Sequence, residues 1–349
     1  MHVGVFLDFP RHGRSSDAEA FQESLGLAQL SEELGLDSVW LAELHFYPAV
    51  SVISSPLIVA SAIAASTKTI KVGTAVEVLP LGNPVRLAEE VATLDNIAQG
   101  RFEFGVGRSG AATGYVGYGV PYSESTARFW ECLDVIRKAW TQQSFSYDGK
   151  FYHYHNVTLA PRPYQSPHPP IRIAANSPDT FPGAAKEGLS LFIGLRGVPT
   201  VLKERVASYR QAWANEGRPG RPDVSLRLPV YVAHTMAQAQ ADPKEGALSF
   251  YRDFVAKIFK EPLPDLTQAE NDERAARGQR LENVTYEDIL KTDTAYGTPE
   301  VVTQRILELK EELGLDGIVA EMNFGGRMRR EQVEASMRLF AAEVLPNLR

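Results

Sequence analysis

Apolar and polar positions follow two patterns along this chain, short apolar runs and longer amphipathic stretches. Eight runs are apolar at several consecutive positions, as expected of parallel strands that are covered on both faces. They comprise residues 3–9, 37–43, 70–78, 101–107, 170–176, 189–194, 224–233 and 317–323. Eight strands separated by helices favour a (β/α)8 TIM barrel, and an open doubly wound sheet is the alternative.

The stretches between these runs carry helix start and stop signals. Residues 17–35 begin at Asp17, a suitable cap, and stop at a glycine. Residues 83–100 place Asn83 as the cap, Pro84 in the first helical position and a glycine at the end. The same signals predict helices over residues 126–140, 179–188, 199–217, 298–314 and 330–345.

Two stretches interrupt the alternation. Residues 144–169 contain short β-like pieces around Asp148-Gly149 and then many prolines, which predicts a hairpin excursion. Residues 261–283 are charged and poor in large apolar groups, so they bury little surface and are expected to be mobile. In a barrel this second insertion is either an idle loop or a lid over the site.

Composition narrows the class of protein. The 349 residues are 44% hydrophobic and 23% charged with a net charge of −7, which disfavours nucleic acid or an anionic membrane as partner. The single cysteine, Cys132, lies in an amphipathic pattern and reads as a buried structural thiol, and no zinc-like cluster accompanies it. No signal peptide or transmembrane run is visible. We expect a cytoplasmic protein with one domain over residues 1–349 and no metal.

The glycine spacing Gly105-x-Gly107-x-x-Gly110 follows the fourth apolar run and suggests a dinucleotide-binding turn. That fingerprint needs a helix at its third glycine, because the pyrophosphate rests on the helix N-terminus. The following residues 111–125 look turn-like and non-helical, and no acidic residue ends a next strand. We therefore reject the dinucleotide site and expect the glycines to let a ligand approach the strand end.

Two arginines near this strand end predict an anion site. Arg108 brings a guanidinium into the opening, and this group suits phosphate oxygens. Arg128 lies at the start of the next helix, past the candidate caps Ser123 and Ser125, where the helix dipole opposes a cation. A bound anion would explain its position, and a solvated surface arginine is the alternative.

The fifth run ends in a third element of the same kind. Asn176, Ser177 and Thr180 surround the start of a helix, where hydroxyls and free backbone N–H groups favour an anion. Ordinary N-capping would satisfy the same residues without a ligand. If the ligand interpretation holds, the arginines and hydroxyls converge in a phosphate site on the face where barrel enzymes place their chemistry.

A second group of candidates follows the second and third runs. Glu43 and His45 end the second run, and an imidazole there can serve as a general base or hydrogen-bond a ring. A histidine satisfied in the pocket wall is the alternative. The small residues Thr74 and Ala75 leave room for a flat ring against the backbone, although plain small-residue packing explains them equally well.

Several dispersed stretches of this chain resemble the bacterial luciferase-like flavin monooxygenase family. They are SEELGLDSVWLAELHF, KVGTAVEVLPLGNPVRLAEEVATLDNIAQGRFEFGVGRSG, IAANSPDT, YGTPE, IVAEMNFGG and ASMRLFAAEVLP. The resemblance covers nearly the whole chain and implies a (β/α)8 barrel with insertions. It also implies reduced FMN and O2 as co-substrates, or a reduced deazaflavin in some branches.

The resemblance assigns roles to residues of this chain. It places the flavin phosphate on Arg108, Arg128, Ser177 and Thr180 with Asn176 beside them, and the isoalloxazine near Phe6, Glu43, Ala75 and Val76. It implies a non-proline cis peptide at the matching place of the third strand. It also makes residues 261–283 similar to the family's mobile lid, which shields the reaction from water.

Two departures from luciferase limit what the resemblance implies. Luciferase has two adjacent histidines after the glutamate, whereas here Leu44 takes the first place and only His45 remains. Luciferase's reactive cysteine is Gly107 here. We therefore do not expect light emission or luciferase's own aldehyde chemistry, while flavin binding stays expected.

These observations predict a two-component monooxygenase that takes reduced FMN from a separate flavin reductase. It would insert one oxygen atom from O2 into a small organic substrate by way of a C4a-peroxyflavin, with Glu43 and His45 relaying protons near the ring. A homodimer is the expected assembly. The alternatives are a deazaflavin-dependent hydride-transfer oxidoreductase and a non-catalytic partner subunit of the luciferase type.

Overall fold

The computed structural model describes residues 1–14, 16–194 and 199–349 and shows a closed barrel of eight parallel strands. The strands are β1 (His2–Leu7), β2 (Ser38–Leu41), β3 (Lys71–Thr74), β5 (Phe102–Gly107), β8 (Ile171–Ala174), β9 (Ser190–Gly194), β10 (Val224–Val232) and β12 (Gly317–Glu321). All eight predicted runs are confirmed. Because β12 pairs with β1 and β9 pairs with β10, the sheet has no open edge, and the doubly wound alternative is wrong.

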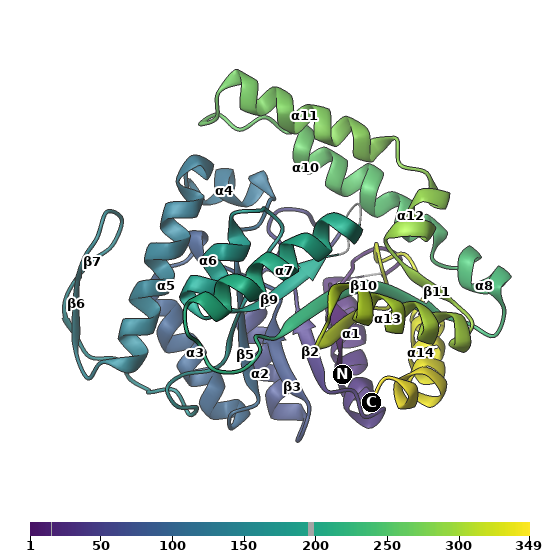
Figure 1. Cartoon of the computed structure of the whole chain (residues 1–349), viewed down its shortest axis with the longest axis horizontal. Helices are drawn as coiled ribbons and strands as arrows, with labels where there is room; N and C mark the ends of the chain where they lie inside the picture. The colour runs from purple at the N-terminus through teal and green to yellow at the C-terminus, as the bar shows by residue number, and fades with distance from the viewer. Residues whose placement is uncertain (15, 195–198) are drawn as a thin grey trace.

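Two further strands extend this sheet at its carboxyl end. The short β4 (Glu77–Val78) pairs with β5, and β11 (Ala295–Gly297) pairs with β10. A separate antiparallel pair, β6 (Phe145–Asp148) and β7 (His153–Val157), lies outside the barrel. It follows α5 and protrudes at the side of the molecule in Figure 1, so the predicted hairpin excursion is confirmed.

Helices cover the outside of the barrel between successive strands (Figure 1). They are α1 (Asp17–Glu33), α2 (Pro56–Ser66), α3 (Pro84–Ala98), α5 (Ser125–Thr141), α6 (Thr180–Glu187), α7 (Pro199–Asn215), α13 (Pro299–Leu313) and α14 (Arg330–Leu339). The remaining α-helices lie in the longer connections: α4 (Ala112–Tyr118), α8 (Met236–Ala241), α9 (Lys244–Ser249), α10 (Ala256–Lys260), α11 (Gln268–Glu282) and α12 (Tyr286–Thr292). Short 3₁₀ turns occur at Leu79–Leu81, Tyr122–Glu124 and Leu345–Asn347, and π turns at Phe250–Val255 and Phe340–Val344.

The helix caps confirm one sequence prediction and correct two. The Asn83 side chain accepts the backbone N–H groups of Val85 and Arg86, as an N-cap should. Helix α1 is capped by Ser16, whose Oγ accepts the Glu19 N–H at 3.2 Å, while the predicted cap Asp17 lies in the first turn. Ser125, also predicted as a cap, is the first residue of α5, and its helix has no side-chain cap.

Residues 111–125 contain a second difference from the sequence prediction. They were expected to be non-helical, but α4 begins at Ala112, directly after the glycine-rich turn. A helix therefore does follow Gly110. The dinucleotide interpretation still fails, because β5 is the fourth strand of a closed barrel rather than the first strand of an open sheet.

The centre of the barrel is filled by aromatic side chains from opposite strands. Trp40 of β2 meets Phe192 of β9 edge-on, with ring centroids 4.5 Å apart. Gly73 makes room for this layer, since a Cβ at that position would lie 2.1 Å from the Trp40 ring. A side chain there would displace the indole, so glycine at position 73 is a packing requirement.

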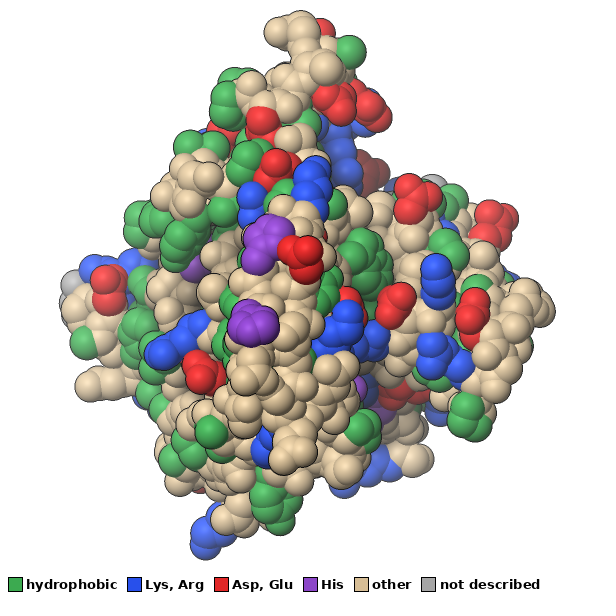
Figure 2. All heavy atoms as spheres, turned by 90° about the vertical axis from the view of Figure 1, so that its left-hand side faces the viewer, with side chains coloured by type: hydrophobic (Ala, Val, Ile, Leu, Met, Phe, Trp, Pro, Cys, Tyr) green, Lys and Arg blue, Asp and Glu red, His purple; other side chains and the backbone are tan. Residues whose placement is uncertain are grey.

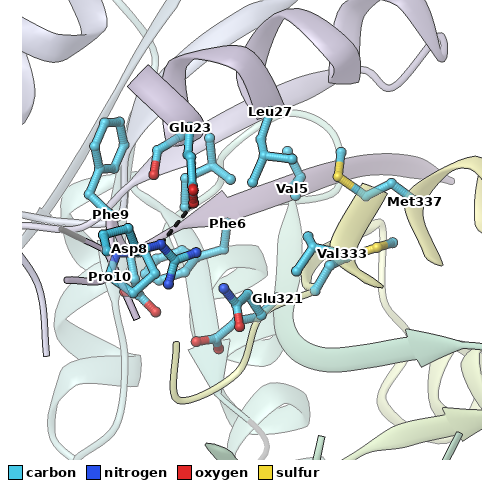
Figure 3. A pocket seen from close by; sticks show the side chains of 15 residues that line it. Val5, Phe6, Asp8, Phe9, Pro10, Glu23, Leu27, Glu321, Val333 and Met337 are labelled. Carbon is cyan, nitrogen blue, oxygen red and sulfur yellow. Dashed lines mark hydrogen bonds and ion pairs between the residues drawn. The ribbon is translucent and has the colours of Figure 1, made fainter. Parts of the chain in front are cut away.

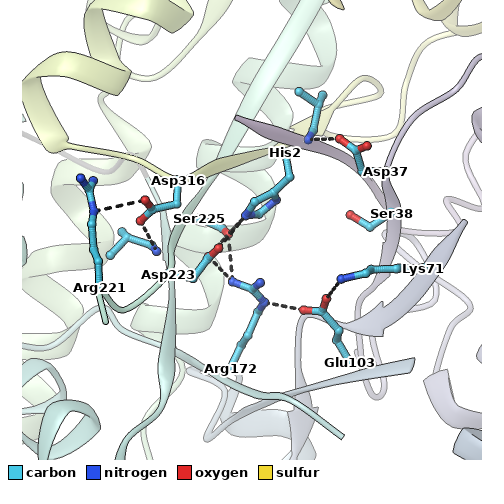
Figure 4. Close-up of polar contacts among 12 residues, drawn as sticks. His2, Asp37, Ser38, Lys71, Glu103, Arg172, Arg221, Asp223, Ser225 and Asp316 are labelled. Carbon is cyan, nitrogen blue, oxygen red and sulfur yellow. Dashed lines mark hydrogen bonds and ion pairs between the residues drawn. The ribbon is translucent and has the colours of Figure 1, made fainter. Parts of the chain in front are cut away.

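Below this aromatic layer, a network of ionic side chains occupies the amino-terminal end of the barrel (Figure 4). We call it the basal network; its members are His2, Lys71, Glu103, Arg172, Asp223 and Ser225. Arg172 donates to Glu103 at 2.8 Å and also to Asp223. Lys71 binds the other oxygen of Glu103, and His2 lies 2.8 Å from Asp223. Five strands and the residue before β10 are thereby joined across the barrel.

The predicted lid segment, residues 261–283, is largely the helix α11, which packs along α10 beyond the carboxyl end of the barrel (Figure 1). Thr267 and Glu270 form a reciprocal capping box at its start. Glu261 accepts from the Tyr47 hydroxyl at 2.9 Å, and Asp265 accepts the Ser123 N–H at 2.6 Å. These two contacts tie the segment to the β2–α2 and α4–α5 connections.

Four further features complete the description of the fold. Cys132 is buried in α5, as predicted. The two termini meet, since the amino group of Met1 donates to the Leu348 carbonyl at 2.9 Å. Figure 2 shows basic and acidic side chains interspersed over the face turned to the viewer. Within the described ranges, no helix is both long and apolar enough to cross a membrane.

The basal network predicts how stability depends on its central arginine. Replacing Arg172 by Met leaves two carboxylates facing each other without their shared cation, so we expect a loss of about 3 kcal/mol in the free energy of unfolding at pH 7. Urea unfolding measures it. As a matched control, Arg330→Met breaks the surface pair with Glu334 and should cost less than about 1 kcal/mol. Equal losses in the two variants would contradict the prediction.

The same network sets the acid sensitivity of the fold. Burial raises the pKa of Glu103, but Arg172 and Lys71 outweigh it and hold that pKa below its usual value. Burial also opposes ionisation of Asp223, yet His2 and Arg172 keep its pKa well below the ordinary range. Carboxylates with lowered pKa values stabilise the fold above about pH 4 and lose this contribution as the pH falls further. Arg172→Met should therefore flatten the acid side of the stability curve.

Candidate functional site

A pocket opens at the carboxyl end of the barrel, and we call it the mouth pocket. It encloses about 720 Å³ of empty space, including open solvent. Strand residues from β1, β8, β9, β10 and β12 line it together with the segment after β3 and the Phe250–Val255 turn. Its lining residues are Phe6, Ala75, Val76, Ala174, Asn176, Phe192, Ile193, Gly194, Arg227, Pro229, Phe250, Tyr251, Val319, Glu321 and Phe324.

The backbone after β3 forms one wall of this pocket. The Ala75–Val76 peptide is cis, as the family resemblance implied, and both residues line the pocket. Thr74 does not take part, because it is fully buried and its Oγ1 donates to the Gly105 carbonyl at 2.7 Å. The small-residue wall therefore begins at Ala75.

Gly105 and Gly107 make room for the residues of this wall rather than for a ligand. A Cβ at Gly105 would lie 1.8 Å from the Thr74 carbonyl oxygen, and one at Gly107 would lie 2.5 Å from the Val76 side chain. The expectation that these glycines open space for a ligand is wrong, because the neighbouring segment already fills that space. Gly110 differs, since no atom of the described residues lies within 4 Å of its Cβ position.

Glu43 and His45 form a buried pair at the end of β2. His45 Nε2 lies 2.6 Å from Glu43 Oε1, and the other carboxylate oxygen accepts the Val78 N–H at 2.6 Å. The Tyr118 hydroxyl lies 3.4 Å from His45 Nδ1. One tautomer suits all these contacts, with Nε2 donating to Glu43 and Nδ1 accepting from Tyr118. The histidine is thus oriented on both sides, as a proton-handling group requires.

A further carboxyl, Glu77, lies close to this pair. Burial raises the pKa of Glu77 well above its usual value, and the negative charges of Glu43 and Glu90 raise it further. Its Oε2 is buried and has no hydrogen-bond partner among the described residues. A neutral Glu77 beside Glu43 avoids placing two negative charges in the same buried region.

Arg108 follows β5 directly and turns toward α5. Its Nη1 donates to Ser125 Oγ at 3.1 Å, while the Tyr115 hydroxyl donates to its backbone carbonyl. Ser125 starts α5, and Arg128 lies one turn further along that helix. The two predicted arginines are therefore neighbours at the N-terminus of α5.

Arg128 is not a freely solvated side chain. It pairs with Glu124 at 2.8 Å, and its guanidinium lies 4.4 Å from the centroid of the Phe151 ring. Phe151 belongs to the β6–β7 hairpin, so the excursion holds this arginine from outside the barrel. An anion would have to share Arg128 with Glu124.

Asn176 and Ser177 lie between β8 and α6, and Thr180 is the first residue of α6. The hydroxyls of Ser177 and Thr180 are 2.8 Å apart, and Asn176 lines the mouth pocket. The N-cap residue of α6, Asp179, makes no side-chain cap hydrogen bond. Side-chain N-capping is therefore not realised among the described residues. The N–H groups of Thr180 and Phe181 instead donate to the carbonyls of Ser177 and Pro178 at 3.1 and 3.3 Å, so this helix start offers an acceptor its two hydroxyls.

The structure brings together only part of the predicted site. Phe6, Ala75, Val76 and Asn176 line the mouth pocket. The remaining predicted residues lie outside its lining, at neighbouring strand ends and helix starts: Glu43, His45, Arg108, Arg128, Ser177 and Thr180. Because parallel strands end at one rim, all ten residues belong to the same end of the barrel.

Sequence reasoning missed a charged cluster of three residues at this rim. Arg227 of β10 donates Nε and Nη2 to the two oxygens of Glu321 of β12 at 2.9 and 2.8 Å. Asp8, just after β1, lies 3.7 Å from the same guanidinium. Asp8 and Glu321 also line a second, smaller cavity between β1, α1 and α14 (Figure 3). The sequence signal that could have revealed this cluster is the charged residue Arg227 inside the apolar run 224–233.

Comparison with known proteins identifies the class to which this architecture belongs. Residues 1–317 match the family described as luciferase-like monooxygenase. The chain belongs to this family of flavin-dependent monooxygenases and oxidoreductases, as its sequence motifs had suggested. The structure of the monooxygenase RslO1 from Streptomyces bottropensis is 26% identical, covers 100% of both chains and superposes with a TM-score of 0.82.

Relatives in the family carry different activities in their names. The alkanal monooxygenase alpha chain of Photorhabdus luminescens is 26% identical over 100% of this chain and 97% of its own length. The oxygenase component of the flavin-dependent trigonelline monooxygenase of Acinetobacter baylyi is 25% identical over 99% and 95%. The F420-dependent glucose-6-phosphate dehydrogenase of Kineococcus radiotolerans is 30% identical over 65% and 69%. Protein y4vJ of Sinorhizobium fredii is 37% identical over 55% of each chain.

The packing of the glycines predicts losses of different size at Gly105, within β5, and at Gly110, in the turn that follows. Gly105→Ala should lower the free energy of unfolding by about 3 kcal/mol, because the new methyl group meets the backbone of β3 and cannot be relieved by a rotamer change. Gly110→Ala should change it by no more than about 0.5 kcal/mol. Thermal and urea unfolding of the two variants measure both values. A larger loss for Gly110→Ala would refute this assignment.

Proposed function

We propose that this chain is the oxygenating component of a two-component monooxygenase, which uses reduced FMN and O2 to oxygenate a small organic substrate. One observation carries the proposal: the pocket wall of Phe6, Ala75 and Val76 lies at the same barrel end as Arg108 and the paired hydroxyls of Ser177 and Thr180. This combination suits a molecule with a flat ring at one end and a phosphate at the other.

The residues present fit FMN. Arg108, Ser177 and Thr180 would hold the phosphate, with Arg128 contributing through its shared contact with Glu124. Phe6, Ala75 and Val76 would contact the isoalloxazine, and Asn176 lies between the two regions. Bound reduced flavin supplies the electrons for oxygen activation.

Two further tasks, the exclusion of water and the handling of a proton, belong to side chains of this protein. The aromatic wall of the mouth pocket excludes water from the reacting atoms. The Glu43–His45 pair, oriented by Val78 and Tyr118, would hold a proton at His45 Nε2 and leave Nδ1 as an acceptor. The proposal implies two protein partners, a reductase that supplies reduced FMN and a second copy of the chain in a homodimer.

A deazaflavin-dependent hydride transfer is the second candidate function. It is supported by the relative named as F420-dependent, which is 30% identical over 65% of this chain. The same phosphate residues and ring wall would serve either cofactor, so the choice between them depends on binding preference and on oxygen.

The first test is an anaerobic titration of the protein with reduced FMN and, separately, with a reduced deazaflavin, followed by rapid mixing with oxygenated buffer. We expect tighter binding of reduced FMN and a slow, oxygen-dependent absorbance change of the bound flavin. Preference for the deazaflavin without an oxygen-dependent phase would favour hydride transfer. Binding of neither would refute both candidates and leave a non-catalytic partner subunit.

The phosphate assignment has its own test. Arg108→Ala removes a charge-assisted contact, so we expect FMN affinity to fall by about 10- to 100-fold. Riboflavin lacks the phosphate and is the matched control ligand, and its affinity should stay within about twofold. Flavin fluorescence titration measures both. An equal loss for the two flavins, or unchanged FMN affinity, would remove Arg108 from the phosphate site.

A further inference from the structure

Arg227 occupies an unusual position in the mouth pocket. It lies in the middle of β10, among residues that are otherwise mostly apolar, and its guanidinium carbon is 3.5 Å from the centroid of the Phe6 ring. Two of its nitrogens are taken by the carboxylate of Glu321, which is only 2% exposed. The guanidinium is thus fixed in orientation by a bidentate ion pair on one edge and an aromatic face.

The third nitrogen, Nη1, has no hydrogen-bond partner in the described part of the chain, while Nε and Nη2 both bind Glu321. The Arg227 side chain is 28% exposed and lines the mouth pocket, so this edge remains accessible. A donor held rigidly at a pocket wall loses little conformational entropy when an acceptor binds.

The charge of Arg227 is already balanced. Glu321 neutralises it through the bidentate contact, and Asp8 adds a second carboxyl 3.7 Å away. Burial and the neighbouring Glu321 raise the pKa of Asp8 well above its usual value, although Arg227 opposes this rise. A raised pKa favours the neutral form of Asp8, so Glu321 alone balances the guanidinium. A ligand carboxylate brought to this guanidinium would therefore add a negative charge with no cation left to pair with it. The free edge therefore favours a neutral acceptor over an anionic one.

The rest of the pocket specifies a flat and apolar occupant. Five aromatic rings contribute to its lining, from Phe6, Phe192, Phe250, Tyr251 and Phe324. Asn176, Arg227 and Glu321 supply the amide and charged side chains among the lining residues. Glu321 can accept but already holds Arg227. The Asn176 amide is a second donor, but Arg227 is the one that a bidentate ion pair fixes at this wall for an oxygen acceptor.

We propose that Arg227 is the polar anchor of the mouth pocket and that its Nη1 edge donates to a neutral carbonyl oxygen on a flat, apolar molecule. This inference rests on the proposed function, because it names the chemical class that the same site accepts. Such a carbonyl belongs either to the organic substrate, as in an aryl ketone, or to the pyrimidine edge of the flavin ring. Glu321 is the positioning residue that holds the guanidinium and cancels its charge.

The test compares the wild-type protein with the double variant Arg227→Met/Glu321→Gln, which removes the anchor without leaving an unpaired carboxylate at position 321. Arg330→Met/Glu334→Gln, a surface ion pair on α14, is the matched control. Thermal unfolding first establishes that both variants fold. Fluorescence titrations then use 2-acetylnaphthalene, 2-ethylnaphthalene and 2-naphthoate, with and without FMN, and FMN itself.

In the wild type the ketone should bind more tightly than both the hydrocarbon and the carboxylate. If the carbonyl belongs to the substrate, ketone affinity should fall by about tenfold in the double variant, while hydrocarbon affinity should stay unchanged. If it belongs to the flavin, FMN affinity should fall instead by a similar factor. The surface control should change none of these values.

Three results would overturn the anchor. They are unchanged ketone and FMN affinities in the double variant, tighter binding of the carboxylate than of the ketone in the wild type, and no binding of any probe or flavin. If the double variant does not fold, Arg227→Lys in the same titrations replaces it, because a lysine keeps the charge near Glu321 but lacks the third donor position. Failure of the proposed function is distinguishable, since it appears as absent FMN binding in the wild type.

Discussion

The closure of the barrel by strands from opposite ends of the chain is the constraint on which the site depends. β1 pairs with β12 in the register His2–Gly317 to Val5–Ala320, and β12 pairs with β10 on its other side. This pairing brings Phe6, Glu321 and Arg227 to adjoining strands although they are more than 90 residues apart in sequence. Without closure, Arg227 would keep the carboxylate on the adjacent strand β12 but would lose its aromatic neighbour Phe6.

Periodicity predicted the fold well because every barrel strand is covered on both faces and therefore reads as a continuous apolar run. The same rule predicted where the chemistry lies, since Glu43, Arg108 and Asn176 each follow such a run and parallel strands end together. The contacts that these residues make could not be predicted by the same rule. The Glu124–Arg128 pair has the i,i+4 spacing that the sequence offers as a helical ion pair. Nothing in the sequence indicates, however, that the Val76 side chain fills the space beside Gly107.

The failed predictions have physical causes that can be named. Residues 111–125 looked non-helical because of their glycines, yet α4 is stabilised from outside, with Tyr115 buried beneath it and Tyr118 against His45. Residues 261–283 were expected to be mobile, as an idle loop or a lid, and that expectation stays a prediction. The helix α11 within them was not predicted, although the capping box of Thr267 and Glu270 was readable as a helix start. Arg227 was overlooked because patterns of apolar positions say nothing of which carboxylate will meet an arginine across a barrel.

Both ends of the barrel place an arginine beside two carboxyl groups, but the two arginines serve different purposes. At the base, Arg172 is 9% exposed and binds Glu103 and Asp223 directly, beneath the rings of Trp40 and Phe192. At the mouth, Arg227 also faces two carboxyls, but it engages one of them closely and remains 28% exposed toward a pocket. An arginine sealed between carboxylates contributes to stability, whereas one that keeps an accessible donor edge can bind a ligand. The Trp40–Phe192 layer lies next to the basal arginine, and Phe192 also lines the mouth pocket, so one aromatic ring borders both environments.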